Sequence, residues 1–116
     1  MEYKIKEVSE ITNISQSKIR YYEKEGLLPE LKRDENNIRV FSEKDIELIS
    51  LIRCLRYIGM SVKEIRNNLN VLTDTNNNQA AIDILIEHRD KLEDQRRVLK
   101  THIDKINSSL EKMQNN

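Results

Sequence analysis

The chain is poor in the residues that make tight turns, disulfides and membrane spans. Its 116 residues include two glycines, one proline, one cysteine and no tryptophan, and only 4% are aromatic. Folds rich in hairpins need more turn residues than this. A single cysteine excludes an internal disulfide, so a reducing cytoplasm is the expected location. No apolar run approaches the roughly 18 residues of a membrane span, and the first residues do not resemble a signal peptide.

An excess of charge of one sign is also missing. Twenty basic and twenty acidic side chains cancel to a formal net charge of zero, although charged residues make up 34% of the chain. The net charge therefore gives no indication of a nucleic acid, a membrane or another partner. Catalytic patterns are absent as well: no glycine-rich phosphate loop, Ser/His/Asp order or pair of carboxylates stands out. We do not expect an enzyme.

The last third of the chain carries an apolar heptad pattern. Apolar side chains recur at two positions of a seven-residue repeat: Ile82, Leu85, Leu92, Leu99, Ile103, Ile106, Leu110 and Met113. This pattern predicts a coiled-coil helix over 80–113, about 50 Å long, with a tail at 114–116. Arg89 and Arg96 fill two positions of the repeat, where they weaken the seam and can fix its register or orientation. A head of about 70 residues cannot cover such a stripe, so we expect a dimer; the alternative is one helix packed back on its own domain.

A polar stretch separates this helix from the rest of the chain. Residues 73–79 read TDTNNNQ and contain no apolar side chain. Thr, Asn and Asp favour hydrogen bonds to the local backbone, so the stretch predicts a linker between a first domain at 1–72 and the helix. One of the residues from Asp74 to Asn78 is expected to cap that helix.

The first 72 residues begin with two short helices. Apolar residues at three-residue spacing predict the inner face of a helix over 5–12: Ile5, Val8, Ile11 and Ile14. Asn13, which tolerates the left-handed conformation, ends it. Ser15 caps a second helix, with Ile19 and Tyr22 facing inward and Gly26 after its end. Two helices joined by a tight turn have helix-turn-helix geometry.

A small ribbon and two further helices follow. Asn36-Asn37 predicts a turn, and Ile38, Val40 and Phe41 suit a strand, so a small wing is expected. Ser42 with Asp45, and Ser61 with Glu64, have the spacing of capping boxes and begin a third and a fourth helix. Their expected inner faces are Ile46, Ile49, Leu51, Ile52 and Leu55, and Val62, Ile65, Leu69 and Leu72.

Three ordered motifs resemble the MerR family of bacterial transcription regulators. The chain reads IRYYEKEGLLP at 19–29, IRVFS at 38–42 and LRYIGMSVKEI at 55–65, at the spacing of that family. The resemblance covers about residues 3–72. Asn13 and Asn37 stand where many members carry glycine, and both tolerate the left-handed conformation.

The resemblance implies a mainly α fold: a winged helix-turn-helix head of four helices and a small β wing, followed by a long helix that forms an antiparallel coiled-coil homodimer. It further implies that the dimer binds double-stranded promoter DNA whose −35 and −10 elements are too far apart. Distortion of the duplex then realigns these elements for RNA polymerase, so part of the specificity is indirect readout.

The second helix and the wing are the expected DNA contacts. The second helix would enter the major groove, with base and phosphate contacts from Gln16, Ser17, Lys18, Arg20 and Tyr21. The wing would add Lys32, Arg33 and Arg39, and Lys63 would form a second phosphate clamp. Counterion release makes such binding fall steeply with salt. Two alternatives stay open: Arg39 can tether the wing to Glu23 or Glu25, and Lys18 and Lys32 can be ordinary solvated surface.

Cys54 has two interpretations. It lies beside inward-facing Ile52 and Leu55, which favours a partly buried packing residue. Arg53 and Arg56 flank it, and cations favour the reactive thiolate form of cysteines. The surrounding motif also resembles the thiol-dependent branch of the family, which answers aldehydes, other electrophiles or nitrosative stress. This resemblance implies a thiol sensor.

Neither a metal nor another cofactor is expected. Metal-responsive relatives use two or more cysteines near the coiled coil, and none lies there in this chain. His88 and His102 are 14 residues apart on the predicted helix, too far to bind one ion together. No appended effector-binding domain is expected after Met113. The alternative function is a helical protein–protein adaptor with no DNA-binding role, which would ignore duplex DNA at moderate salt.

Overall fold

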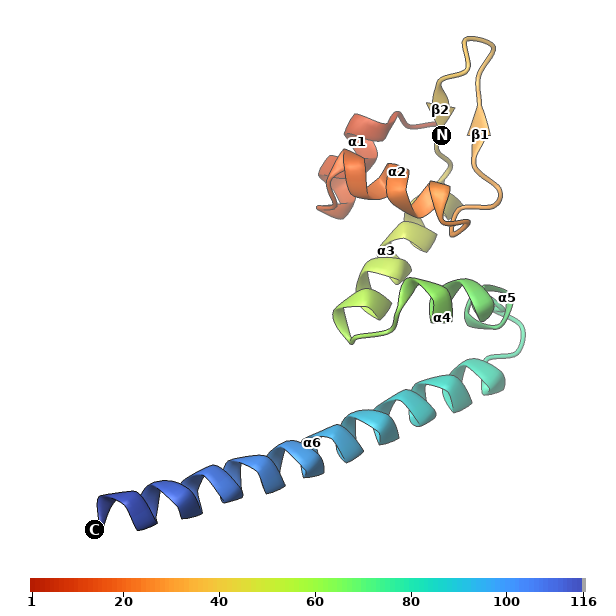
Figure 1. The fold of residues 1–116 in the computed structure, drawn as a ribbon. Coiled ribbons are helices and arrows are strands. Elements are labelled where there is room, and N and C mark those ends of the chain that lie inside the picture. The colour runs from red at the N-terminus through yellow and green to blue at the C-terminus, as the bar shows by residue number, and fades with distance from the viewer. Residues whose placement is uncertain (116) are drawn as a thin grey trace. The chain divides into compact units, whose positions relative to one another are not determined.

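The computed structural model describes residues 1–115, which are mostly helical with one small sheet (Figure 1). The elements in chain order are α1 (Ile5–Thr12), α2 (Gln16–Lys24), β1 (Lys32–Arg33), β2 (Arg39–Val40), α3 (Glu43–Tyr57), α4 (Val62–Asn67), α5 (Leu69–Leu72) and α6 (Gln79–Gln114). The chain forms two compact units: the head, Met1–Asn76, and a second unit from Asn77 that contains α6. The predicted helical fold with a small wing and a long C-terminal helix is confirmed. Among the described residues, no helix is long and apolar enough to cross a membrane.

The turn between α1 and α2 is fixed by short side chains. Asn13 adopts the left-handed conformation, with φ 58°, at the end of α1. The Ser9 hydroxyl donates a hydrogen bond to the Ile14 carbonyl at 2.6 Å across the turn. Ser15 then caps α2, its hydroxyl accepting from the Lys18 amide at 3.1 Å. The predicted ends and cap of these helices are confirmed, and the two helices are joined as a helix-turn-helix.

The core of the head is built from one or two inward residues of each helix and of the wing. Its buried apolar side chains are Val8, Ile14, Ile19, Tyr22, Leu27, Leu28, Phe41, Ile46, Ile49, Ile52, Leu55, Met60 and Ile65. The prediction that Ile11 faces inward was wrong, because this side chain is 55% exposed. Thr12 takes the inward position instead, and its hydroxyl donates to the Val8 carbonyl at 2.7 Å. Leu51, also predicted on the inner face, is only half-buried.

The region after α3 differs from the prediction of one fourth helix. Gly59, with φ 93°, lets the chain turn after α3, and Ser61 caps α4 by accepting from the Glu64 amide at 3.0 Å. Asn68 then leaves helical geometry, and its side-chain amide donates to the Glu64 carbonyl at 2.8 Å. Because this side chain occupies a backbone acceptor of the last turn, the predicted helix is divided into α4 and α5.

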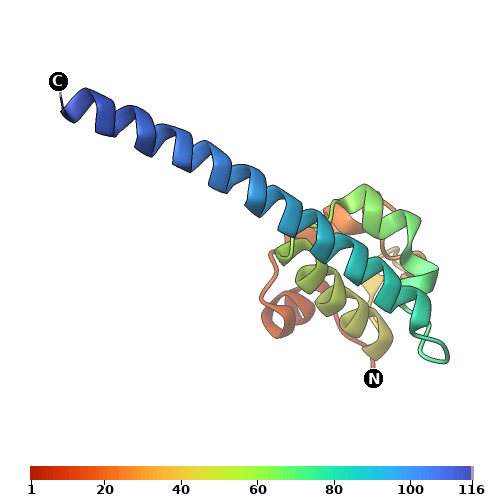
Figure 2. The same cartoon turned by 90° about the horizontal axis from the view of Figure 1, so that it is seen from below.

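The second unit is one long helix. α6 contains 36 residues, which corresponds to about 54 Å, and runs without interruption (Figure 2). The Asn77 side chain accepts from the Gln79 amide at 3.1 Å near its start. The predicted apolar residues of its heptad pattern are between 41% and 74% exposed, from Ile82 to Met113. Within one chain, α6 therefore presents an uncovered apolar stripe.

Candidate nucleic-acid interface

One face of α2 is polar and open to solvent. Ile19 and Tyr22 are buried, which leaves Ser17, Lys18 and Tyr21 on the outside of the helix. Tyr21 is 46% exposed, and its ring centroid lies 6.0 Å from that of the buried Tyr22. A helix that buries one side and presents hydroxyl, amine and phenol groups on the other has the chemistry needed to enter a major groove.

The first and second turns of this face are linked by a side-chain contact. The guanidinium of Arg20 donates to the Gln16 side-chain oxygen at 3.3 Å, one helical turn away. Arg20 is exposed and Gln16 is half-buried. All five residues predicted for α2 thus lie on one helix, and four of them are exposed.

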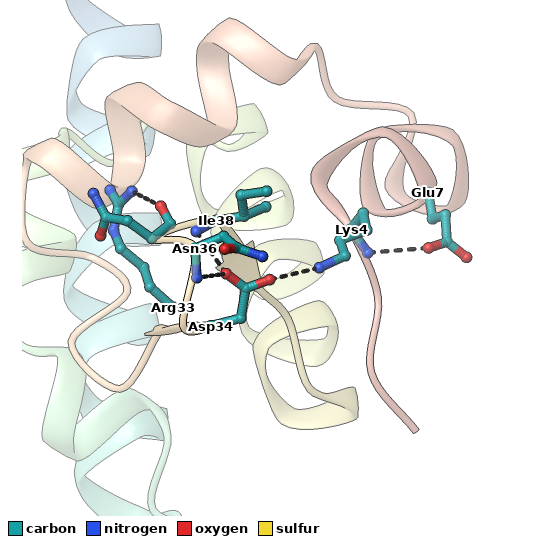
Figure 3. Close-up of polar contacts among 7 residues, drawn as sticks. Lys4, Glu7, Arg33, Asp34, Asn36 and Ile38 are labelled. Carbon is teal, nitrogen blue, oxygen red and sulfur yellow. Dashed lines mark hydrogen bonds and ion pairs between the residues drawn. The ribbon is translucent and has the colours of Figure 1, made fainter.

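The wing is a two-stranded ribbon organised by one carboxylate. In the antiparallel pair, Lys32 faces Val40 and Arg33 faces Arg39. The Asp34 carboxylate accepts from the Asn36 amide at 2.9 Å and the Ile38 amide at 3.0 Å, closing the turn (Figure 3). Asn37 adopts the left-handed conformation there, with φ 62°. A turn held by its own side chain keeps a fixed shape without a large core.

Asp34 also joins the wing to the start of the chain. The Lys4 ammonium lies 3.2 Å from the Asp34 carboxylate (Figure 3). Hydrogen bonds from the Ile38 amide above all, and from Lys4 and Asn36, hold the pKa of Asp34 below its ordinary value. Sequence reasoning missed this contact, since the two residues are 30 positions apart and neither belongs to a motif.

A second connection at the N-terminus holds the base of the wing. Tyr3 and Phe41 exchange backbone hydrogen bonds of 2.8 Å, forming an isolated antiparallel bridge. The Tyr3 hydroxyl donates to the Glu43 carboxylate at 2.7 Å, which raises the pKa of Tyr3. Residues before the first helix are therefore part of the interface scaffold, although no sequence signal identified them.

The wing is tied to α2 by Glu23. The Arg39 guanidinium lies 2.6 Å from the Glu23 carboxylate, and that of Arg33 lies 3.5 Å from it. Arg33 also donates to the Asn37 carbonyl at 3.1 Å. Of the two open interpretations of Arg39, the structure thus shows the tether to Glu23. With its side chain 24% exposed, Arg39 positions the wing rather than standing on its surface.

Other predicted cations are more open. Lys32 is exposed on β1 and has no ion pair among the residues that the structure describes. Lys63 is exposed in the first turn of α4. α4 is itself anchored to the end of α2, because the Arg66 guanidinium donates to the Glu25 carbonyl at 3.1 Å. α2, the wing and α4 are thus held to one another by specific contacts within the head.

Cys54 does not have the partly buried environment that its neighbours indicated. It lies on α3 and is exposed, whereas Ile52 and Leu55 are buried. Helix geometry explains the difference, since residue 54 follows Ile52 by two positions, or about 200°, and so points away from the core. The thiol is accessible to solvent in the head.

Comparison with known proteins supports this arrangement. Residues 3–72 match the model of the MerR HTH family regulatory proteins, and residues 46–109 match a second one described as MerR, DNA binding. The chain is 31% identical over 122 residues to the uncharacterised HTH-type transcriptional regulator YyaN of Bacillus subtilis, covering 94% of this chain and 88% of YyaN. It is 32% identical over 89 residues to the HTH-type transcriptional regulator AdhR of the same organism, covering 76% of this chain but only 64% of AdhR.

A solved structure gives the same result for the fold. HiNmlR, described as a MerR family regulator lacking the sensor domain and bound to promoter DNA, matches with a TM-score of 0.66 and 32% identity. The match covers 90% of this chain and 80% of that one.

Proposed function

This chain belongs to the MerR family of helix-turn-helix regulatory proteins, and from that premise we propose that it binds double-stranded promoter DNA as a homodimer and regulates transcription there. The observation that carries the proposal is the polar outer face of α2, fixed beside the wing by the ion pair between Glu23 and Arg39 at 2.6 Å. Its target then lies in the bacterial cytoplasm.

Contacts divide into those that read bases and those that hold phosphate. Gln16, Ser17, Lys18 and Tyr21 are placed to meet base edges and the nearby backbone as α2 enters the major groove. Arg20, Lys32 and Lys63 supply exposed cations for phosphate, and Arg33 shares its charge between Glu23 and the duplex. Binding should weaken steeply with salt, because each phosphate contact releases condensed counterions.

The proposed action on the promoter is distortion of the duplex. Two heads joined through α6 would bind two half-sites on either side of an overlong spacer between the −35 and −10 elements. Bending and untwisting this spacer would realign the elements for RNA polymerase, at an energetic cost that depends on the sequence being deformed. Central base pairs that no side chain touches should then affect affinity.

Cys54 supports a further element of the proposal, a response to electrophile or redox stress. Its thiol is exposed, and Arg53 precedes it on α3. Cations beside an accessible cysteine favour the thiolate that reacts with electrophiles. Brief exposure of the folded protein to an aldehyde or to diamide should modify Cys54, as read by intact-protein mass spectrometry. An unmodified Cys54 would end the sensing role and leave DNA binding unaffected.

Footprinting tests the proposed function directly. The protein is added to the DNA upstream of its own gene, and transcription is measured on the same template. We expect protection across an overlong spacer, with hypersensitive bases at its centre and altered transcription. No protection at moderate salt would overturn the proposal and would favour the adaptor alternative.

A further inference from the structure

The apolar seam of α6 needs a partner that spans the whole helix. Its eight apolar residues, Ile82, Leu85, Leu92, Leu99, Ile103, Ile106, Leu110 and Met113, are all at least 41% exposed in the single chain. On the basis of the homodimer proposed above, we propose that a second copy of α6 covers this seam in one antiparallel register. In it, Ile82 faces the partner's Met113, and the two-fold axis passes between residues 97 and 98.

The two arginines of the seam determine the orientation. Arg89 and Arg96 fill the same heptad position as Ile82, Ile103 and Leu110. In a parallel pair each position faces itself, so two adjacent core layers would hold arginine against arginine, with like charges in contact. In an antiparallel pair the two apolar positions face each other. Arg96 then packs its aliphatic stem against the partner's Leu99, and Arg89 packs against the partner's Ile106.

Coverage of the seam selects one register among the antiparallel ones. In the proposed register Leu85 faces the partner's Leu110, and Leu92 faces the partner's Ile103, so every apolar residue of the seam is covered. A shift by one heptad in one direction uncovers the Leu110 and Met113 end. A shift in the other direction uncovers Ile82 and Leu85. Either shift would leave large apolar side chains in water, at about 25 cal/mol per Å² of apolar surface left exposed.

Charges beside the seam select the same register. Antiparallel pairing brings the same flanking position of both helices together, which here places Glu93 beside the partner's Lys100 on both sides of the axis. One heptad shift would place Glu93 beside its own copy, and the other would place Lys100 beside its own copy. Both alternatives put like charges at the axis, where the proposed register has two ion pairs.

The single helix already has a site shaped for this pairing. Arg96, Leu99, Lys100 and Ile103 line a shallow hollow on the surface of α6. These four positions form the hole that receives one side chain of the facing helix in knobs-into-holes packing. In the proposed register that side chain is the partner's Arg96. Within one chain, the Arg96 guanidinium lies 2.7 Å from the Glu93 carboxylate, so the partner's Glu93 would neutralise the arginine and reach Lys100 together.

Disulfide trapping tests the register in the full chain, with Cys54→Ser removing the natural thiol. The double variant Leu92→Cys/Ile103→Cys should form a covalent dimer in a mild redox buffer, because each cysteine faces the other one on the partner. Each single variant should stay uncross-linked, whereas a parallel pair would cross-link both. The matched pairs Leu92→Cys/Arg96→Cys and Leu99→Cys/Ile103→Cys report the two shifted registers and should also stay uncross-linked.

Charge reversal gives a second readout. Glu93→Lys or Lys100→Glu alone should weaken the dimer about tenfold, since each change turns two ion pairs into two repulsions. Both changes together should restore the dissociation constant to within about twofold. The control Lys105→Glu, on the outer side of α6, should leave it unchanged. Cross-linking by a different pair, or no rescue by the double reversal, would overturn the register alone. A monomer in sedimentation of the unmodified chain would overturn the homodimer as well.

Discussion

The head and α6 use their apolar side chains in opposite ways. In the head, Phe41, Ile49 and Ile65 are fully buried by neighbouring elements, although each helix has only a few turns. In α6, Leu99 and Ile106 are 59% and 58% exposed although the helix is the longest element. The head therefore contains its own stabilising core, whereas the apolar surface of α6 lowers the free energy only when something outside the chain covers it. The comparison teaches that fold and assembly are encoded in separate parts of the sequence.

Removing one core side chain from the head should have the largest effect on stability. Phe41→Ala should lower the free energy of unfolding by about 3–5 kcal/mol, because a fully buried aromatic ring leaves a cavity next to the bridge with Tyr3. Urea denaturation followed by tyrosine fluorescence measures the change. The matched control is Ile38→Ala, three residues away and 51% exposed, which should cost less than about 1 kcal/mol. Equal effects of the two changes would contradict the core described for the head.

A charge in the seam should leave the head folded and abolish assembly. Leu92→Glu should raise the dimer dissociation constant by at least about a hundredfold, or about 2.7 kcal/mol, because a carboxylate replaces an apolar side chain in two layers of the dimer. Sedimentation equilibrium measures this constant, and the tyrosine signal of the head should unfold at an unchanged urea concentration. Ser108→Glu, on the outer side of α6, is the control. A dimer that tolerates Leu92→Glu would show that another surface holds the two copies together.

Local sequence patterns were sufficient for most of the fold. Ser15 and Ser61 identified helix starts, and Asn13 and Asn37 identified the left-handed turns, because capping and turn chemistry act over a few residues. Motif resemblance supplied the order of helix, wing and helix. The division of α4 from α5 at Asn68 was missed, since the hydrogen bond that ends the helix depends on one rotamer rather than on a pattern.

The site was predicted less completely, because its geometry depends on contacts distant in sequence. The residues of α2 could be listed from helix periodicity alone. The tie between Arg39 and Glu23 was one of several open pairings until the two elements were placed together. The contacts of Tyr3 and Lys4 join the chain start to residues more than 25 positions away, and no local signal announces them. Cys54 shows the same limit, since its neighbours alone indicated more burial than it has.

Two cations of the wing should separate positioning from contact. Arg39→Ala should lower the free energy of unfolding by about 1–2 kcal/mol, because it removes a part-buried ion pair and leaves Glu23 with Arg33 only. Lys32→Ala should leave stability within about 0.5 kcal/mol but weaken DNA binding and lower the slope of log affinity against log salt by about 0.9. Urea melts and fluorescence-anisotropy titrations at several salt concentrations measure both. If Lys32→Ala were the destabilising change of the two, the assignment of roles would be wrong.

The smallest expected effect concerns pH and the turn of the wing. The amide of Ile38 is the main cause that holds the pKa of Asp34 below its ordinary value of 3.8, with the charge and hydrogen bond of Lys4 adding to it. A lowered pKa in the folded state means that the folded chain binds fewer protons than the unfolded one. The contribution of Asp34 is therefore present above about pH 4 and is lost as pH falls through the lowered pKa of the folded state.

Amide exchange of the wing is the measurement that isolates this contribution. Protection of the Asn36 and Ile38 amides, which donate to the Asp34 carboxylate, should fall on acidification below about pH 4, after correction for the intrinsic exchange rate. Protection in α6, which has no contact with this carboxylate among the described hydrogen bonds, should not follow the same titration. Asp34→Asn should remove the titration from the wing, whereas Glu35→Gln, the neighbouring exposed carboxyl, should leave it in place. A wing that keeps its protection through this range would show that the ribbon pairing and the Glu23 tether hold the turn without Asp34, and that the wing resembles the core of the head more than it resembles α6.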